Sequence, residues 1–218
     1  MPKEEIMASI EKTLDSLKKN KMAAYYAETR EEAKKLALSL IEKGAVCASG
    51  GSVTLAETGI IDALKGEDYH YIDRYAPELT PEGRIAAMEK AMHADVYLSS
   101  ANAITEKGEI YNVDGNSNRV SALLYGPKSV IIVAGVNKLV EDLDAAVRRV
   151  KTVAAPKNAA RLSCDTPCAK LGHCIAVEGG MTEGCASPAR ICCNFTVMAQ
   201  QRHPERVKVI LVGEELGY

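Results

Sequence analysis

The densest run of chemically capable side chains lies in residues 102–119, where amide, carboxylate and guanidinium groups follow an apolar stretch. Arg119 could hold a carboxylate or phosphate through two parallel hydrogen bonds, and Glu106 could act as an acid, a base or a nucleophile. Either residue could equally be a solvated charge or part of a structural ion pair. The turn-forming dipeptides Lys107-Gly108 and Asp114-Gly115 also favour a hairpin here. A hairpin and a binding loop are compatible, because functional loops are often built on such turns.

A second candidate site is Gly50-Gly51-Ser52, placed where an expected strand turns into an expected helix. Two glycines let backbone amides approach a ligand closely, and the free amides of a helix start attract phosphate or carboxylate. A tight turn in which Ser52 caps the helix explains the same residues equally well.

Six of the seven cysteines fall within residues 164–193. Disulfides are unfavourable in a reducing cytoplasm, whereas thiolates grouped in an irregular segment commonly bind zinc or an iron–sulfur cluster. The spacing matches neither a zinc ribbon nor a ferredoxin run, and a disulfide or simple buried thiols remain the alternatives. His173 is the only histidine that we consider as a further ligand, and Cys47 is expected in the core. A subset of six residues is therefore predicted to bind metal: Cys164, Cys168, Cys174, Cys185, Cys192 and Cys193.

Regular elements must position these groups, and strands and helices are predicted to alternate along the chain. This alternation indicates an α/β fold with a mainly parallel sheet, in which ligands bind beyond the carboxyl ends of the strands. We expect one domain over residues 1–218, with a core (1–160), a cysteine-rich segment (161–195) and a final strand and tail (206–218). Strands are expected at 22–27, 45–49, 69–73, 94–99, 110–113, 129–134 and 206–212, and helices at 29–43, 53–64, 81–93, 119–124 and 139–155.

Composition excludes several classes of function. The formal net charge of −2 gives no basic surface for a nucleic acid. No apolar run approaches the ~20 residues that span a bilayer, and the first 21 residues have the pattern of an amphipathic helix rather than an export signal. A soluble, cytoplasmic protein with no membrane association is expected. Aromatic residues make up only 5%, and a core of small aliphatic residues suits a parallel sheet covered by helices.

Two segments carry a family resemblance, GGSVTLAETGI at residues 50–60 and ADVYLSSANAITEKGEIYNVDGNSNRVSALLYGPKSVIIVAGVNKLV at residues 94–140. Both are similar to the lactate-utilisation (LUD) domain family, which includes lactate utilisation protein C, and the likeness extends over most of the chain. The resemblance implies a Rossmann-like three-layer fold of the NagB/RpiA/CoA-transferase-like group. It also implies one pocket lined by Gly51, Ser52, Glu57, Asn102, Thr105, Glu106, Asn116, Asn118 and Arg119, with Glu106 as the candidate catalytic residue.

The pattern CDTPCAKLGHC followed by CASPARICCN resembles a subgroup of short LUD proteins, whereas lactate utilisation protein C lacks these cysteines. Ten residues separate Cys174 from Cys185, which is a longer spacing than the subgroup implies. The doubled Cys192-Cys193 leaves the fourth ligand open between two residues.

The resemblance implies a component of small hydroxy-acid (lactate) oxidation or utilisation that binds a small anionic molecule and works with iron–sulfur redox partner proteins. An alternative is an isomerase or CoA-transferase-like enzyme, in which Glu106 acts on a phosphorylated or thioester substrate. A non-catalytic sensor module stabilised by its metal is a third hypothesis. Assembly into a homo-oligomer is compatible with all three.

Overall fold

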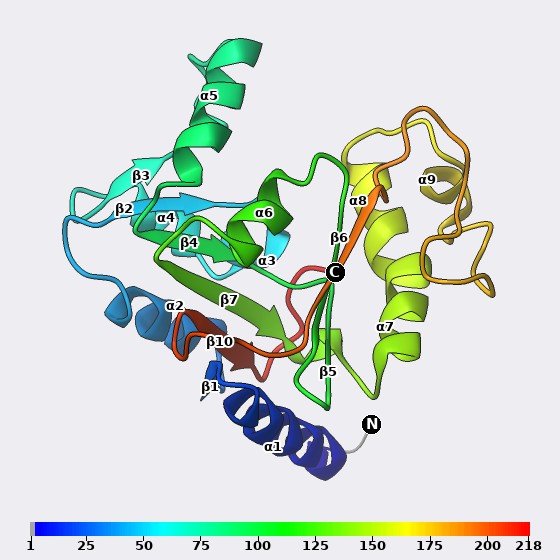
Figure 1. Ribbon diagram of the computed structural model, residues 1–218, viewed down its shortest axis with the longest axis horizontal. Coiled ribbons are helices and arrows are strands. Elements are labelled where there is room, and N and C mark those ends of the chain that lie inside the picture. The colour runs from blue at the N-terminus through cyan, green and yellow to red at the C-terminus, as the bar shows by residue number, and fades with distance from the viewer. Residues whose placement is uncertain (1–2) are drawn as a thin grey trace.

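Two β-sheets organise the residues that the computed structural model describes, 3–218 (Figure 1). The larger sheet has six strands, all parallel, in the order β1-β10-β7-β4-β2-β3. The prediction of an α/β fold with a mainly parallel sheet is confirmed. These strands are β1 (Ala23–Ala27), β10 (Val207–Val212), β7 (Ser129–Gly135), β4 (Val96–Ser99), β2 (Val46–Ser49) and β3 (His70–Ile72).

Helices cover both faces of the larger sheet, because its central strands are apolar on both sides. In β7, Val130 and Ile132 belong to one core cluster, while Ile131 and Val133 belong to the cluster on the opposite face. Successive strand residues point to opposite faces, so a continuous apolar run needs cover on both. One face packs against α2 (Arg30–Ser39), α3 (Val53–Glu57) and α4 (Ile60–Leu64), and the other against α1 (Lys3–Lys19), α5 (Pro81–Ala91) and α6 (Asn118–Leu124).

The smaller sheet has four strands in the order β8-β5-β6-β9 and lies beside the larger one (Figure 1). Its β5 and β6 are antiparallel and joined through Gly108, whose φ of +77° suits glycine, so the predicted hairpin is confirmed. A helical run packs on this sheet through Ala146, Val150 and Ala154. The elements are β8 (Leu139–Val140), β5 (Ala103–Thr105), β6 (Ile110–Asp114), β9 (Asn194–Met198), α7 (Leu143–Arg149), the π-helical turn η2 (Val150–Ala154), α8 (Ala155–Arg161) and, further along, α9 (Pro167–Leu171).

Two predicted helices have different bounds in the structure. The helix expected over residues 53–64 is divided into α3 and α4 at Gly59, which adopts a left-handed conformation with φ of +67°. The helix expected over residues 139–155 begins only at Leu143, where Asp142 caps it, and continues through η2 and α8 to Arg161. Helix α9 was not predicted, because the cysteine-rich segment shows little periodicity, and strand β9, which begins at the end of that segment, was not predicted either. Within residues 3–218, no helix has the length and apolar character needed to cross a membrane.

Candidate functional site

A cleft lies at the carboxyl ends of three adjacent strands of the larger sheet. Gly51 and Ser52 follow β2, Ser100 and Asn102 follow β4, and Lys138 ends the short 3-10 helix η1 (Val136–Lys138) that follows β7. We call this space the sheet-edge cleft. It has an outer part of about 310 Å³ and an adjoining inner pocket of about 90 Å³. The position is the one predicted for ligand binding in a parallel sheet.

The sheet-edge cleft is strongly cationic. Its lining includes one carboxylate, from Asp114, and that carboxylate is paired with Arg119 at 3.1 Å. Clefts lined by charges of one sign concentrate ligands of the opposite sign. The charges that line the cleft therefore favour the binding of an anion. The cationic residues are Arg74, Arg84, Arg119 and Arg161, with Lys138 in the inner pocket.

The guanidinium of Arg119 is held by the protein itself. Its nitrogens donate to Asn112 Oδ1 at 2.6 Å, to the Val113 carbonyl at 2.8 Å and to Asn102 Oδ1 at 3.2 Å. Gly50 makes room for this side chain, since a Cβ there would lie 2.9 Å from Arg119 Cδ. Arg119 consequently fixes β6 against the end of β4 and contributes its charge to the cleft from a rigid position.

Arg161 and Arg74 face the cleft with fewer protein acceptors. Arg161 donates through Nε to the Tyr218 hydroxyl at 2.6 Å and through Nη2 to Asn158 Oδ1 at 2.8 Å. The Arg74 guanidinium lies 4.7 Å from the centre of the Tyr75 ring, and its buried Nε has no hydrogen-bond partner among residues 3–218. Buried donors are normally paired, so Arg74 is suited to receive a ligand oxygen.

Lys138 is the most chemically distinctive residue of the inner pocket. Its side chain is almost fully buried, and Nζ donates to Thr54 Oγ1 at 2.7 Å and to Ser100 Oγ at 2.8 Å. Burial lowers the pKa of this ammonium to about 7, with the positive charges of Arg149 and Arg119 acting in the same direction and Glu57 opposing them. An amine that is partly neutral near pH 7 can accept a proton or attack a carbonyl.

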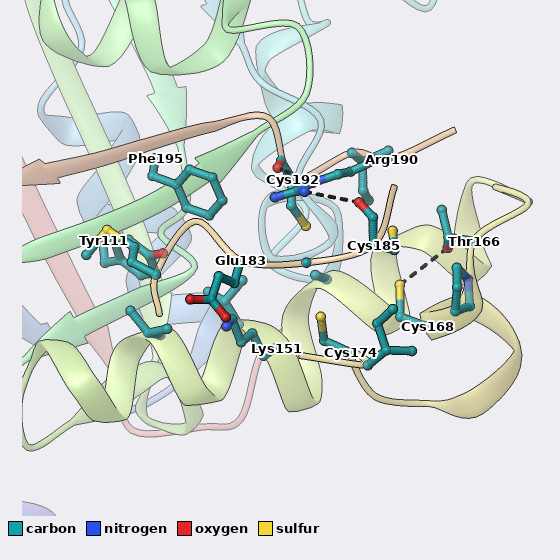
Figure 2. A pocket seen from close by; sticks show the side chains of 18 residues that line it. Tyr111, Lys151, Thr166, Cys168, Cys174, Glu183, Cys185, Arg190, Cys192 and Phe195 are labelled. Carbon is teal, nitrogen blue, oxygen red and sulfur yellow. Dashed lines mark hydrogen bonds between the residues drawn. The ribbon is translucent and has the colours of Figure 1, made fainter. Parts of the chain in front are cut away.

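A second cavity is formed by the cysteine-rich segment over the smaller sheet (Figure 2). Cys168, Cys174, Cys185 and Cys192 all line it, and we call it the cysteine pocket. The rest of its wall is mainly apolar and includes Val150, Met181 and Phe195. Its volume is about 30 Å³.

Two cations hold the irregular walls of the cysteine pocket. Buried Lys151 donates to the carbonyls of Ala176, Gly179 and Gly180 at 2.6, 2.8 and 2.7 Å. Arg190 donates to three further carbonyls, those of Thr182, Cys185 and Cys192, at 2.8 to 3.1 Å. The segment is thus organised by charged donors that satisfy backbone oxygens.

Cys192 is the most perturbed of these thiols. Burial and, to a smaller extent, the neighbouring Cys168, Cys174 and Cys185 raise its pKa to about 11, against the opposing effect of Arg190. Within residues 3–218, no three His, Cys, Asp or Glu side chains are arranged to hold one metal ion. A single ion in the cysteine pocket would therefore require its thiols to rearrange.

Comparison with known families identifies the chain. The model described as "LUD domain" matches residues 10–212. The chain belongs to the LUD-domain family. No curated protein matches this LUD domain in sequence.

One solved structure is similar to this LUD domain over almost its whole length, and others match it in part. A DUF162-family protein from Deinococcus radiodurans is similar with a TM-score of 0.50 and 17% identity, over 98% of this chain and 99% of that one. Ribose 5-phosphate isomerase A from Methanocaldococcus jannaschii matches with a TM-score of 0.36 and 14% identity, over 62% and 64% of the two chains. eIF2B delta from Chaetomium thermophilum matches at 0.34 and 18%, over 50% and 47%. The first of these similarities shows a shared fold and says nothing of function.

The structure brings together six of the nine residues expected to share a pocket in this LUD domain. Glu57 lies outside the lining and accepts a hydrogen bond from the Gly217 amide at 2.7 Å. Thr105 and Glu106 also lie outside it. The six residues that line the sheet-edge cleft are Gly51, Ser52, Asn102, Asn116, Asn118 and Arg119.

Glu106 is placed where it cannot act in the sheet-edge cleft, and this corrects the expectation of one shared pocket. It follows β5, which leads away from the cleft, and its carboxylate accepts hydrogen bonds from Lys12 at 2.7 Å and Ser9 at 2.8 Å. These two donors from α1 lower the pKa of Glu106, while burial acts in the opposite direction. Thr105 Oγ1 is likewise occupied, by Glu109.

Four cationic cleft residues were missed by sequence reasoning, namely Lys138, Arg74, Arg84 and Arg161. Lys138 and Arg74 follow predicted strands by only a few residues, so the rule that ligands bind at strand ends could have singled them out. Arg161 does not follow a predicted strand, because it lies at the end of α8, where the cysteine-rich segment begins. Of the six predicted metal ligands, Cys164 and Cys193 do not line the cysteine pocket.

Proposed function

We propose that this LUD domain binds a small organic acid in the sheet-edge cleft and takes part in the oxidation or utilisation of a small hydroxy acid such as lactate, together with iron–sulfur redox partner proteins. The observation that carries the proposal is the cationic cleft ending in a buried lysine. Family membership supports the substrate class.

The inner pocket suits a compact acid. Its volume is about 90 Å³, and Lys138, Ser52 and Ser100 surround it with polar groups. A carboxylate in the outer part would meet Arg74 and Arg161, leaving the hydroxyl or carbonyl carbon of the same molecule near Lys138. With a pKa of about 7, the Lys138 amine is largely neutral at slightly alkaline pH and can take up the proton of the substrate hydroxyl.

An isomerase or CoA-transferase-like activity is the second candidate, and the outer cleft favours it. A volume of about 310 Å³ with four arginines gives room for a phosphorylated substrate. In that activity Lys138, rather than Glu106, would be the base, because Glu106 lies outside the cleft. A sensor module would bind the same anion without turnover.

Ligand-induced thermal stabilisation tests the proposal. Lactate, glycolate and pyruvate are expected to raise the melting temperature more than ribose 5-phosphate or acetyl-CoA, because ligands that bind only the folded state stabilise it. Arg161→Gln removes two charge-assisted donors and is expected to weaken binding by roughly tenfold or more. Arg148→Gln is the matched control, since Arg148 is exposed and pairs only with the exposed Glu178.

The outcomes distinguish the candidates. A preference for ribose 5-phosphate or acetyl-CoA would favour the isomerase or transferase hypothesis. Equal responses in Arg161→Gln and the wild type would remove Arg161 from the site, and a lack of response to every acid would reject the proposal.

A further inference from the structure

The geometry points to a binding site for a four-iron, four-sulfide cluster in the cysteine pocket, with Cys168, Cys174, Cys185 and Cys192 as its four ligands. The site lies in a wall of the sheet-edge cleft. It is distinct from the proposed acid site and stands on its own observations.

The first observation is that four of the cysteines line one cavity. Six cysteines crowd into residues 164–193, but the fold selects four of them for one cavity. Figure 2 shows Cys168 on α9, Cys174 just after it and Cys192 across the cavity, with Cys185 on the intervening loop. Cys193 points elsewhere, with its Sγ donating to the Arg190 carbonyl at 3.3 Å. The ambiguity of the doubled cysteine is thereby resolved in favour of Cys192.

The second observation concerns the kind of group that fits. Structural zinc is usually held by closely spaced cysteine pairs that converge on one point. Here five residues separate Cys168 from Cys174, six separate Cys185 from Cys192, and the four side chains surround a space. Iron–sulfur clusters are held in this way, by one thiolate on each of four irons around a core.

The third observation is the electrostatic setting. A cluster with four thiolate ligands carries net negative charge, and its burial is unfavourable without compensation. Two cations, Arg190 and Lys151, line the pocket and are fixed there by their bonds to carbonyls, and they outnumber the one carboxylate of the lining, that of Glu183. Apolar side chains, including Phe195 and Val150, exclude water from the remaining wall.

The cysteine pocket lies directly beside the sheet-edge cleft. Val150, Ala155, Ile191 and Cys192 line both the cysteine pocket and the outer sheet-edge cleft. The π-helical turn η2 supplies Val150 and Lys151 at this shared wall, and such turns are frequent at functional sites. Because all four irons would carry a cysteine, the cluster would be an electron carrier beside the cleft rather than a direct binder of substrate.

The cysteine pocket has a volume of about 30 Å³, room for roughly two water molecules, so the proposal includes an expansion of this cavity when the cluster assembles. Residues 172–193 contain no helix or strand, and the two cationic side chains donate to six of their backbone carbonyls. Cluster binding is consequently expected to be coupled to ordering of this loop.

Metal and sulfide analysis of the full chain, purified without oxygen or reconstituted with ferrous iron and sulfide, tests the inference. About four iron and four sulfide per chain are expected, with a visible absorption that bleaches and a paramagnetic signal that appears on reduction by dithionite. Serine substitutions C168S, C174S, C185S and C192S should each lose most of the iron.

Cys164→Ser and Cys193→Ser are the matched controls and should keep wild-type iron. Zinc without sulfide, or equal loss of iron in the controls, would overturn the assignment. If the four variants fail to fold by circular dichroism, the stoichiometry and paramagnetic signal of the wild type still decide the question. None of these readouts depends on the acid proposed for the cleft, so the two proposals can fail separately.

Discussion

The sheet-edge cleft and the cysteine pocket share a wall but are built on different physical principles. The cleft lies on strand ends whose preceding residues are fully buried, such as Leu98 in β4 and Val133 in β7. The cysteine pocket is enclosed by a loop whose backbone oxygens are bound by Lys151 and Arg190. Hydrophobic burial therefore shapes the cleft in advance, whereas charged donors and thiols shape the pocket.

Because of this difference, the two regions are expected to respond differently to amino-acid substitutions. A rigid sheet edge keeps its geometry when a single surface contact is lost. A loop that depends on two cations has few alternative contacts to replace them. Substitutions in the loop are thus expected to act locally and strongly, and substitutions of polar groups around the cleft to change chemistry more than folding.

The largest expected effect is that of Lys151→Met. The variant leaves three carbonyls without their donor and is expected to lower the stability of the loop by roughly 2–4 kcal/mol. Urea denaturation and limited proteolysis within residues 172–193 measure the loss. Lys157→Met, on the exposed side of α8, serves as the control. If acid binding at the cleft is lost while the loop stays resistant, the comparison of the two regions is wrong.

An intermediate effect is expected from Lys138→Met, and it depends on pH. The folded state releases the Lys138 proton near pH 7, whereas the unfolded chain keeps it up to about 10.5, so unfolding takes up a proton between these values. The free energy of unfolding of the wild type should therefore rise relative to the variant by roughly 2 kcal/mol from pH 7 to pH 9. Urea titrations at several pH values measure this difference.

Exposed Lys107 provides the control for this experiment, and Lys107→Met should show the wild-type pH dependence. Parallel pH profiles for the wild type and Lys138→Met would mean that Lys138 keeps an ordinary pKa and cannot act as the base. Measurements stay below pH 9 because burial lowers the pKa of Arg149 to about 10, which would add a second titration.

Sequence patterns predicted the large sheet well because its signals are local. The apolar run at 129–134 became β7, and Thr29 caps α2 by accepting a hydrogen bond from the Glu32 amide. Gly51 and Ser52 line the cleft as predicted, since they directly follow a strand. Local periodicity and capping determine these features without reference to distant residues.

The remaining features depend on distant contacts that no local pattern encodes. Lys138 donates hydrogen bonds to Thr54 and Ser100, which are 84 and 38 residues away in the chain. Which four cysteines meet depends on α9 and on the loop that returns to β9. Glu106 was assigned to the cleft because it follows Asn102 closely, but the short strand β5 carries it to α1.

The smallest effect is expected from Glu106→Gln. This variant tests whether Glu106, which is close to the cleft residue Asn102 in sequence, takes part in the cleft although the structure places it against α1. Lys12 is largely exposed, so its ion pair with Glu106 is screened by solvent and contributes little to stability. Loss of the pair should lower the melting temperature by less than about 3 °C and leave acid binding at the cleft unchanged. Thermal melts with and without lactate measure both quantities, with Lys12→Met as the reciprocal control. A Glu106→Gln variant that folds normally but no longer responds to the acid would place the working site at the β5 turn. Among residues 3–218, the side-chain hydrogen bonds of Glu106 go to Ser9 and Lys12 and not to the cleft arginines or Lys138.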